Sequence, residues 1–150
     1  MKSWEILFLP RTTNRTGRSS GIESVVGYAY LALELDDSKR LGKRVLEEMR
    51  SPNNRIWLSP ISTWEALTLN ARGRIRLPAD FGAWVAQATA HFVEAPLTHE
   101  IAVAARRLPW NHKDPADRFL AATAQLLRLT LVTADVALLG LGDISTLANR

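Results

Sequence analysis

The chain has 150 residues, of which 47% are hydrophobic and 23% are charged, and its formal net charge is +4. These values are typical of one folded domain with a real core, and they exclude a disordered chain. The chain contains no cysteine, which excludes disulfides and thiolate metal sites, and it has only three histidines. We therefore expect any bound metal ion to be held by oxygen atoms.

The positive net charge sets a weak preference for an anionic partner. No apolar run approaches the roughly 20 residues needed to span a bilayer. The sequence therefore predicts a cytoplasmic protein that does not enter a membrane.

Residues 1–23 combine a short apolar stretch with a polar, basic segment that has no periodicity, PRTTNRTGRSSGIE. This composition predicts an atypical, mostly flexible N-terminal arm. The folded domain is predicted over residues 24–150. It opens with SVVGYAYLAL at 24–33, which we expect to be a strand turning into a short helix, and Asp36 then opens a helix that ends near Met49.

Short strands and helices alternate through the rest of the chain. Strands are predicted at 55–58 and 92–97, and each is followed by a helix that starts at a capping residue. Further helices are predicted at 80–91 and 114–127, and the apolar segment LTLVT at 129–133 is typical of a buried parallel strand. This order predicts an α/β protein, a three-layer α/β/α sandwich with a mainly parallel central sheet.

Three acidic residues fall at helix starts or just after strands: Glu65, Asp117 and Asp135. In a parallel sheet such positions lie at the carboxyl edge, where α/β proteins bind their ligands. Carboxylates brought together without basic partners repel one another unless a cation is bound, and oxygen ligands of this kind select Mg²⁺ or Mn²⁺. The pattern therefore favours metal-dependent hydrolysis of phosphodiesters.

Each acid also has a structural interpretation. Asp114 and Asp117 stand at the start of a predicted helix, where their carboxylates can simply cap its free N–H groups. Asp135 can cap the next helix, and Glu65 can be a solvated surface acid. From the spacing alone, both interpretations stay open.

The basic and aromatic residues near these acids are equally open to two interpretations. The arginines that follow the helix of Glu65 can form an RNA-binding track or a solvated face. The two basic residues beside Asp117 can hold phosphate or balance local charge. The RNA-binding candidates are Arg72, Arg74, Arg76, Lys113 and Arg118. Trp57 and Trp64 are expected in the core rather than as base-stacking platforms.

Two blocks of the sequence resemble PIN-domain ribonucleases of the VapC toxin type. They are SPISTWEALTLNARGRIRLP at 59–78 and HKDPADRFLAATAQLLRLTLVTAD at 112–135, and the similarity extends upstream to LELDDSKRLGKRVLEEM. The resemblance implies an α/β/α sandwich that hydrolyses RNA with Mg²⁺ or Mn²⁺. It places the catalytic and metal-binding acids on Glu65, Asp117 and Asp135, with Asp114 as an auxiliary metal ligand.

The same resemblance implies a biological setting. Proteins of this type are usually the toxin of a toxin–antitoxin pair, neutralised when a VapB-like antitoxin lays an apolar, arginine-bearing segment into a groove near the active site. In this chain the groove would be lined by Tyr28, Tyr30, Leu31 and Trp64. A homodimer is also expected.

One position departs from the family pattern. The family's first strand ends in Asp, but Val25, Val26 or Gly27 occupies that place here, and none of these residues can bind a metal. Three explanations stay open: an altered start or reading frame, a substitute role for the nearby Glu23, or a PIN-like domain that no longer cuts. In the last case the protein would bind RNA or an antitoxin-like partner without cleavage.

Overall fold

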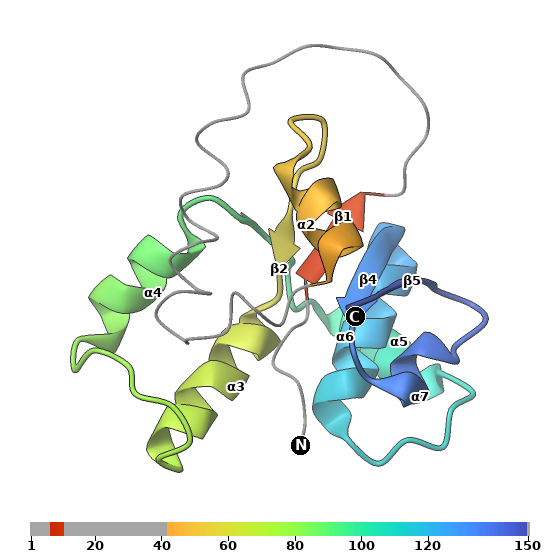
Figure 1. Cartoon of the computed structure of the whole chain (residues 1–150). Helices are drawn as coiled ribbons and strands as arrows, with labels where there is room; N and C mark the ends of the chain where they lie inside the picture. The colour runs from red at the N-terminus through yellow and green to blue at the C-terminus, as the bar shows by residue number, and fades with distance from the viewer. Residues whose placement is uncertain (1–6, 11–41, 150) are drawn as a thin grey trace.

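The computed structural model describes residues 7–10 and 42–149 of the chain (Figure 1). None of the helices within these residues is long and apolar enough to cross a membrane. The elements in chain order are β1 (Leu7–Pro10), α2 (Lys43–Arg50), β2 (Trp57–Leu58), α3 (Pro60–Ala71), α4 (Phe81–Thr89), β3 (Val93–Glu94), α5 (His99–Arg107), α6 (Pro115–Leu127), β4 (Leu129–Thr133), α7 (Val136–Leu139) and β5 (Ser145–Ala148).

The described strands form one five-stranded sheet in the order β3-β2-β1-β4-β5. β2 pairs in parallel with β3, and β4 pairs in parallel with β5. β1 lies between β2 and β4 and is antiparallel to both, so the other four strands share one direction. This topology confirms the prediction of an α/β fold with a mainly parallel sheet.

Strand β1 belongs to residues 1–23, which the sequence predicts to be a flexible arm. For the four residues of β1 that prediction is wrong, because they pair with β4 along their whole length, ending with Pro10 opposite Leu129. The apolar sequence LFLP suits a pleated surface, and the proline, which has no N–H to donate, falls at the end of the strand. The rest of the arm and the strand predicted at 24–33 lie outside the described residues.

Helices cover both faces of the sheet, which gives three layers (Figure 1). On one face α2 packs through Val45 against Val132 of β4. On the other face α6 packs through Leu120 against Leu131 of the same strand. Successive residues of a strand point to opposite faces, so neighbouring β4 residues can serve both layers. The predicted three-layer sandwich is therefore confirmed.

Helix α6 is the central helix of the domain, as its nearly all-apolar sequence predicts. Its largest contact outside the sheet is with α5, where Ala122 meets Ile101 and Ala105. Small side chains at this contact let the two helices approach closely. The completely buried residues of α6 are Leu120, Ala121, Ala122 and Ala124.

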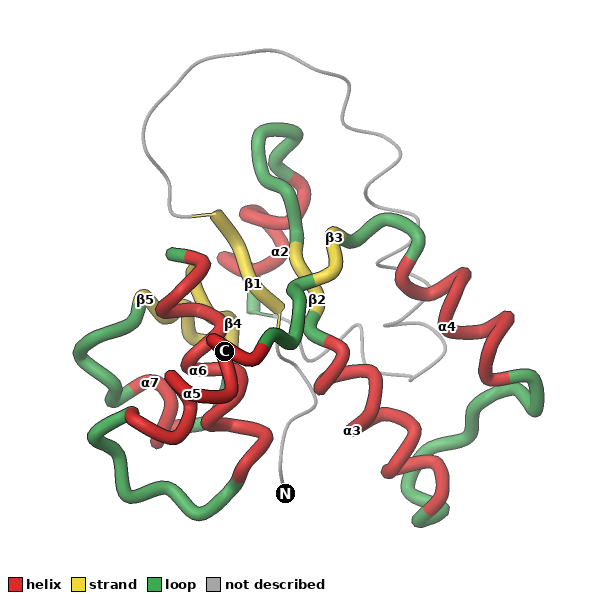
Figure 2. The backbone as a smooth tube through the Cα atoms, turned by 180° about the vertical axis from the view of Figure 1, so that it is seen from behind, coloured by secondary structure: helices red, strands yellow, loops and turns green. Residues whose placement is uncertain are grey.

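Helices α3 and α4 form a hydrophobic cluster of their own, centred on the buried Trp84. Both views show this pair on one side of the molecule and α5, α6 and α7 on the other (Figures 1 and 2). The buried face of α3 carries Ser62 and Ala66, so Trp64 points to the other side of the helix and is 58% exposed. The expectation that Trp64 lies in the core is wrong, whereas Trp57 does pack against the main core.

The C-terminal residues complete the sheet. β5 pairs with β4, and the buried residue Asn149 comes directly after β5 in the sequence. Its Oδ1 atom accepts a hydrogen bond of 2.9 Å from the backbone N–H of Gly42, the residue that caps α2. The last strand is therefore tied to the start of the first described helix.

Candidate active site

The three predicted acids lie at the carboxyl edge of the parallel strands. α3 begins after β2 and α7 begins after β4, so both helices start at this edge. α6 ends where β4 begins, which places the first turn of α6 at the same edge. Glu65 lies in the second turn of α3, Asp117 in the first turn of α6, and Asp135 directly before α7.

Asp117 has the most sharply defined surroundings of the three. It is buried, with 6% of its surface exposed, and its Oδ2 atom lies 2.5 Å from Nε2 of His112. The ring of His112 in turn stacks on Trp110, with ring centroids 4.3 Å apart and an angle of 5° between the planes. A carboxylate withdrawn from water needs polar partners. His112 supplies one and fixes the orientation of the carboxylate.

The cap of α6 is Asp114. Its Oδ1 atom accepts a hydrogen bond of 2.9 Å from the backbone N–H of Ala116, and Pro115 is the first residue of the helix. The capping interpretation is therefore confirmed for Asp114, whose role as an auxiliary metal ligand stays a prediction. Asp117 lies in the first turn of the same helix, and one of its oxygens is directed to His112.

The loop that carries Trp110 and His112 is held by Arg118, one turn of helix away from Asp114. Its guanidinium donates to the backbone carbonyl groups of Ala105 (2.8 Å), Arg106 (3.2 Å), Leu108 (3.0 Å) and Trp110. These bonds join the end of α5 to the first turn of α6. Arg118 thus has a structural role that the amino-acid sequence did not suggest. Its contact with RNA stays a prediction.

Asp135 and Glu65 differ in their surroundings. Asp135 caps α7: its Oδ1 atom accepts a hydrogen bond of 2.7 Å from the N–H of Ala137, and its own N–H donates to Oγ1 of Thr133. The capping interpretation is confirmed for Asp135.

Glu65 is half-buried and its Oε2 atom is shielded from solvent, so the interpretation as a solvated surface acid is wrong. The roles of Asp135 and Glu65 as metal ligands stay predictions.

The predicted RNA-binding residues are dispersed. Arg72, Arg74 and Arg76 are exposed in the turn and loop after α3. A helix of this length extends about 18 Å, so these arginines lie far from the edge at which α3 starts. Lys113 is exposed and lies next to Asp114, beside the acids.

Oxygen donors of this kind suit a hard divalent cation. Nevertheless, no group of three or more His, Asp or Glu side chains that could hold a metal ion is present in residues 7–10 and 42–149. A three-acid metal centre therefore does not fit the described residues alone. Glu23, which the sequence offered as a substitute ligand, lies outside them.

Sequence reasoning missed the role of His112 and Trp110. The available signal was the position of His112, two residues before the capping Asp114 and five before Asp117. A side chain just ahead of a helix can fold back over the first turn. The spacing alone does not require His112 to contact Asp117, because the conformation of the loop before α6 depends on Arg118.

A three-layer α/β domain with acidic residues at the carboxyl edge of its parallel strands is a common framework for ligand-binding enzymes. The family model of the PIN domain matches residues 28–142, which is 115 of the 150 residues. The chain therefore belongs to the PIN domain family. No curated protein and no solved structure matches it. PIN domains are generally nucleases that typically use divalent metals, so the match supports a hydrolytic enzyme with a nucleic-acid substrate.

Proposed function

We propose that this PIN-domain protein is an endoribonuclease that hydrolyses RNA phosphodiester bonds with Mg²⁺ or Mn²⁺ and acts as the toxin of a VapBC-type toxin–antitoxin pair in the cytoplasm. The observation that carries the proposal is the buried Asp117, held by His112 at the edge to which Glu65 and Asp135 also belong. Acidic side chains are seldom buried unless they are paired, and His112 supplies the partner of Asp117 at this edge. The metal requirement rests on the family, and the RNA substrate and toxin role rest on the two sequence blocks.

In phosphodiester hydrolysis, water attacks phosphorus, one ester oxygen leaves, and the water gives up a proton. The chain must therefore hold an anionic phosphate and accept a proton. Lys113 and the net positive charge support the first task. Carboxylates at the edge, Asp117 above all, are suited to orient the attacking water and accept its proton.

A groove between α3 and α4 supports the proposed antitoxin partner. Its volume is 370 Å³, and it is lined by Leu58, Pro60, Thr63, Trp64, Leu67, Val85, Thr89, Phe92 and Glu94. Most of this lining is apolar, and the exposed carboxylate of Glu94 can pair with an arginine. An apolar, arginine-bearing segment of a VapB-like antitoxin matches both features. Tyr28, Tyr30 and Leu31 lie outside the described residues.

A second candidate function is a PIN-like module that binds RNA or an antitoxin-like protein without cleaving RNA. The sequence feature that favours it is the apolar residue, Val25, Val26 or Gly27, at the place of the family's first Asp. Loss of one ligand of a shared metal site typically costs orders of magnitude in activity. A homodimer is proposed under either function.

The test is cleavage of several RNAs by the purified chain in Mn²⁺, with Asp117→Asn and Asp80→Asn variants. Asp80 caps α4 by accepting a hydrogen bond of 3.0 Å from the N–H of Ala83, and asparagine caps equally well. Wild type and Asp80→Asn should cleave RNA, whereas Asp117→Asn should not. RNA binding by the wild type without any products would establish the second candidate, and equal cleavage by all three proteins would refute the assignment of Asp117.

A further inference from the structure

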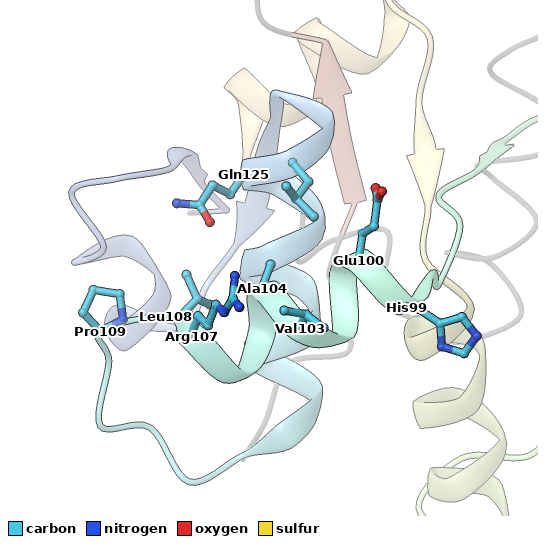
Figure 3. A pocket seen from close by; sticks show the side chains of 9 residues that line it. His99, Glu100, Val103, Ala104, Arg107, Leu108, Pro109 and Gln125 are labelled. Atoms are coloured by element: carbon cyan, nitrogen blue, oxygen red, sulfur yellow. The ribbon is translucent and has the colours of Figure 1, made fainter.

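The loop that joins α5 to α6 leads directly to the candidate site. Figure 3 shows its beginning at the end of α5, where Leu108 and Pro109 line a shallow groove of 670 Å³. Proline disfavours a helical conformation for the residue before it, and the ψ angle of Leu108 is 126°, so α5 ends here. The guanidinium of Arg118 binds the carbonyl groups of Leu108 and Trp110. The backbone of the loop is therefore held in place as far as Trp110.

Two ring side chains lie on the inner side of this loop. Trp110 and His112 are half-buried, whereas Asn111 and Lys113 are exposed. Such alternation is typical of an extended chain, in which residues two positions apart point to the same side. The two rings stack, with centroids 4.3 Å apart and an angle of 5° between their planes. Trp110 also packs against the main hydrophobic core, so the indole is the fixed member of the pair.

The stack supplies an orientation that a histidine side chain does not have by itself. The imidazole rotates about the bond from Cβ to Cγ, and this torsion has no sharply preferred angle. Only some of these angles direct Nε2 of His112 toward Oδ2 of Asp117, where the two atoms lie 2.5 Å apart. An indole that covers one face of the imidazole restricts the ring to one plane. The stack therefore selects the angles at which His112 reaches Asp117.

We infer that Trp110 is a positioning residue of the candidate site: its indole holds His112 in the plane from which Nε2 reaches Asp117. The effect of Trp110 on RNA cleavage passes through His112 and rests on the proposed nuclease function. The orientation of His112 does not rest on that function and can be measured separately. A displacement of about 1 Å in an active site can lower the rate about 100-fold, so a loosened imidazole should have a measurable effect.

The first test is a nitrogen–proton correlation spectrum of the histidine rings in the full chain, in which the chemical shift of Nε2 reports its bond to Asp117. The chain has three histidines, so His112→Ala identifies the signals of His112. Trp110→Leu removes the stack but keeps an apolar side chain, and it should shift these signals. Trp110→Phe keeps an aromatic ring and should shift them less. Trp57→Leu is the control, because Trp57 packs against the same core from β2, and it should leave them unchanged.

The second test is the rate of RNA cleavage in Mn²⁺ by the same variants. Trp110→Leu should lower kcat about tenfold and leave KM within about twofold, because it disturbs Asp117 and not the binding of RNA. Trp110→Phe should recover part of the rate. Residues that act as a unit do not have additive effects. The double variant Trp110→Leu/His112→Ala should therefore cleave no more slowly than His112→Ala alone.

Thermal melting, followed by circular dichroism, shows whether each variant is folded at the assay temperature. Unchanged His112 signals in Trp110→Leu would overturn the inference, whether or not the chain cleaves RNA. So would a wild-type kcat in Trp110→Leu, an equal loss of kcat in Trp57→Leu, or a double variant whose loss is the product of the two single losses. A wild-type chain that cleaves no RNA would refute the nuclease proposal, and the spectra alone would then decide the positioning role of Trp110.

Discussion

Replacement of Arg118 by alanine should destabilise the domain more than any other substitution of an arginine on α5 or α6. The Arg118 guanidinium donates to four backbone carbonyl groups between Ala105 and Trp110. Three of these bonds are partly buried and the fourth, to Arg106, is exposed. Without the side chain, the carbonyl groups lose their donor and the loop before α6 loses its anchor.

The size of the effect follows from the three partly buried bonds. A hydrogen bond to a charged group contributes about 1.5–3 kcal/mol, but contributions that share one side chain do not add, and water replaces part of the loss near the surface. We expect Arg118→Ala to lower the free energy of unfolding by about 2–4 kcal/mol. Arg118→Lys should recover only part of this loss, because a single ammonium cannot span the carbonyl groups that the planar guanidinium reaches.

The assay is guanidinium unfolding followed by tryptophan fluorescence, with the midpoint and the slope measured for each variant. Arg106→Ala is the control, since Arg106 is exposed in the last turn of α5, and it should change stability by about 0.5 kcal/mol or less. If Arg118→Ala stays within about 1 kcal/mol of the wild type at an unchanged slope, the guanidinium does not anchor the loop.

Three further predictions concern other contacts. Asn149→Ala removes the buried hydrogen bond to the N–H of Gly42, and urea unfolding should show a loss of about 1–2 kcal/mol. His112→Ala should slow RNA cleavage by about 10–100-fold because Asp117 loses its partner, and His112→Gln, which can place a nitrogen near the same position, should recover part of the rate. Equal rates for wild type and His112→Ala would contradict this positioning role. Trp64→Ala should leave RNA cleavage unchanged but abolish neutralisation by a VapB-like antitoxin in a cell-growth assay.

Helix starts were the part of the fold that the sequence predicted best. Ser59, Asp80, Thr98 and Asp114 were each expected to open a helix, and a cap was one of the two interpretations of Asp135. Each of these side chains accepts a hydrogen bond from a backbone N–H in the following turn. Capping depends on residues only two or three positions apart. A helix start can therefore be predicted from a few neighbouring residues, without knowledge of the tertiary structure.

The strands β1 and β5 could not be predicted in the same way. Each has four residues and no clear alternation, and each is defined by pairing with β4. Which segment fills a position in a sheet depends on distant parts of the chain, as does the bond between Gly42 and Asn149. Pairing partners that lie far apart in sequence leave no local pattern.

In the candidate site, too, features that depend on neighbouring residues were predicted, and contacts that depend on the packing of distant segments were not. The acids were predicted because residue type and position relative to strands and helices are visible in the sequence. The bond between His112 and Asp117 was not, because it requires a loop whose path is set by Arg118. The burial of Glu65 likewise depends on packing and not on its place in α3.

The most direct test of the proposed site is calorimetric titration of Mn²⁺ into the wild type, Asp117→Asn and Asp80→Asn. Wild type and Asp80→Asn should bind the ion, and Asp117→Asn should not, because Asp117 is assigned to the metal site whereas Asp80 caps α4. Equal binding by all three proteins would contradict that assignment, and no binding by the wild type would contradict the proposed metal dependence.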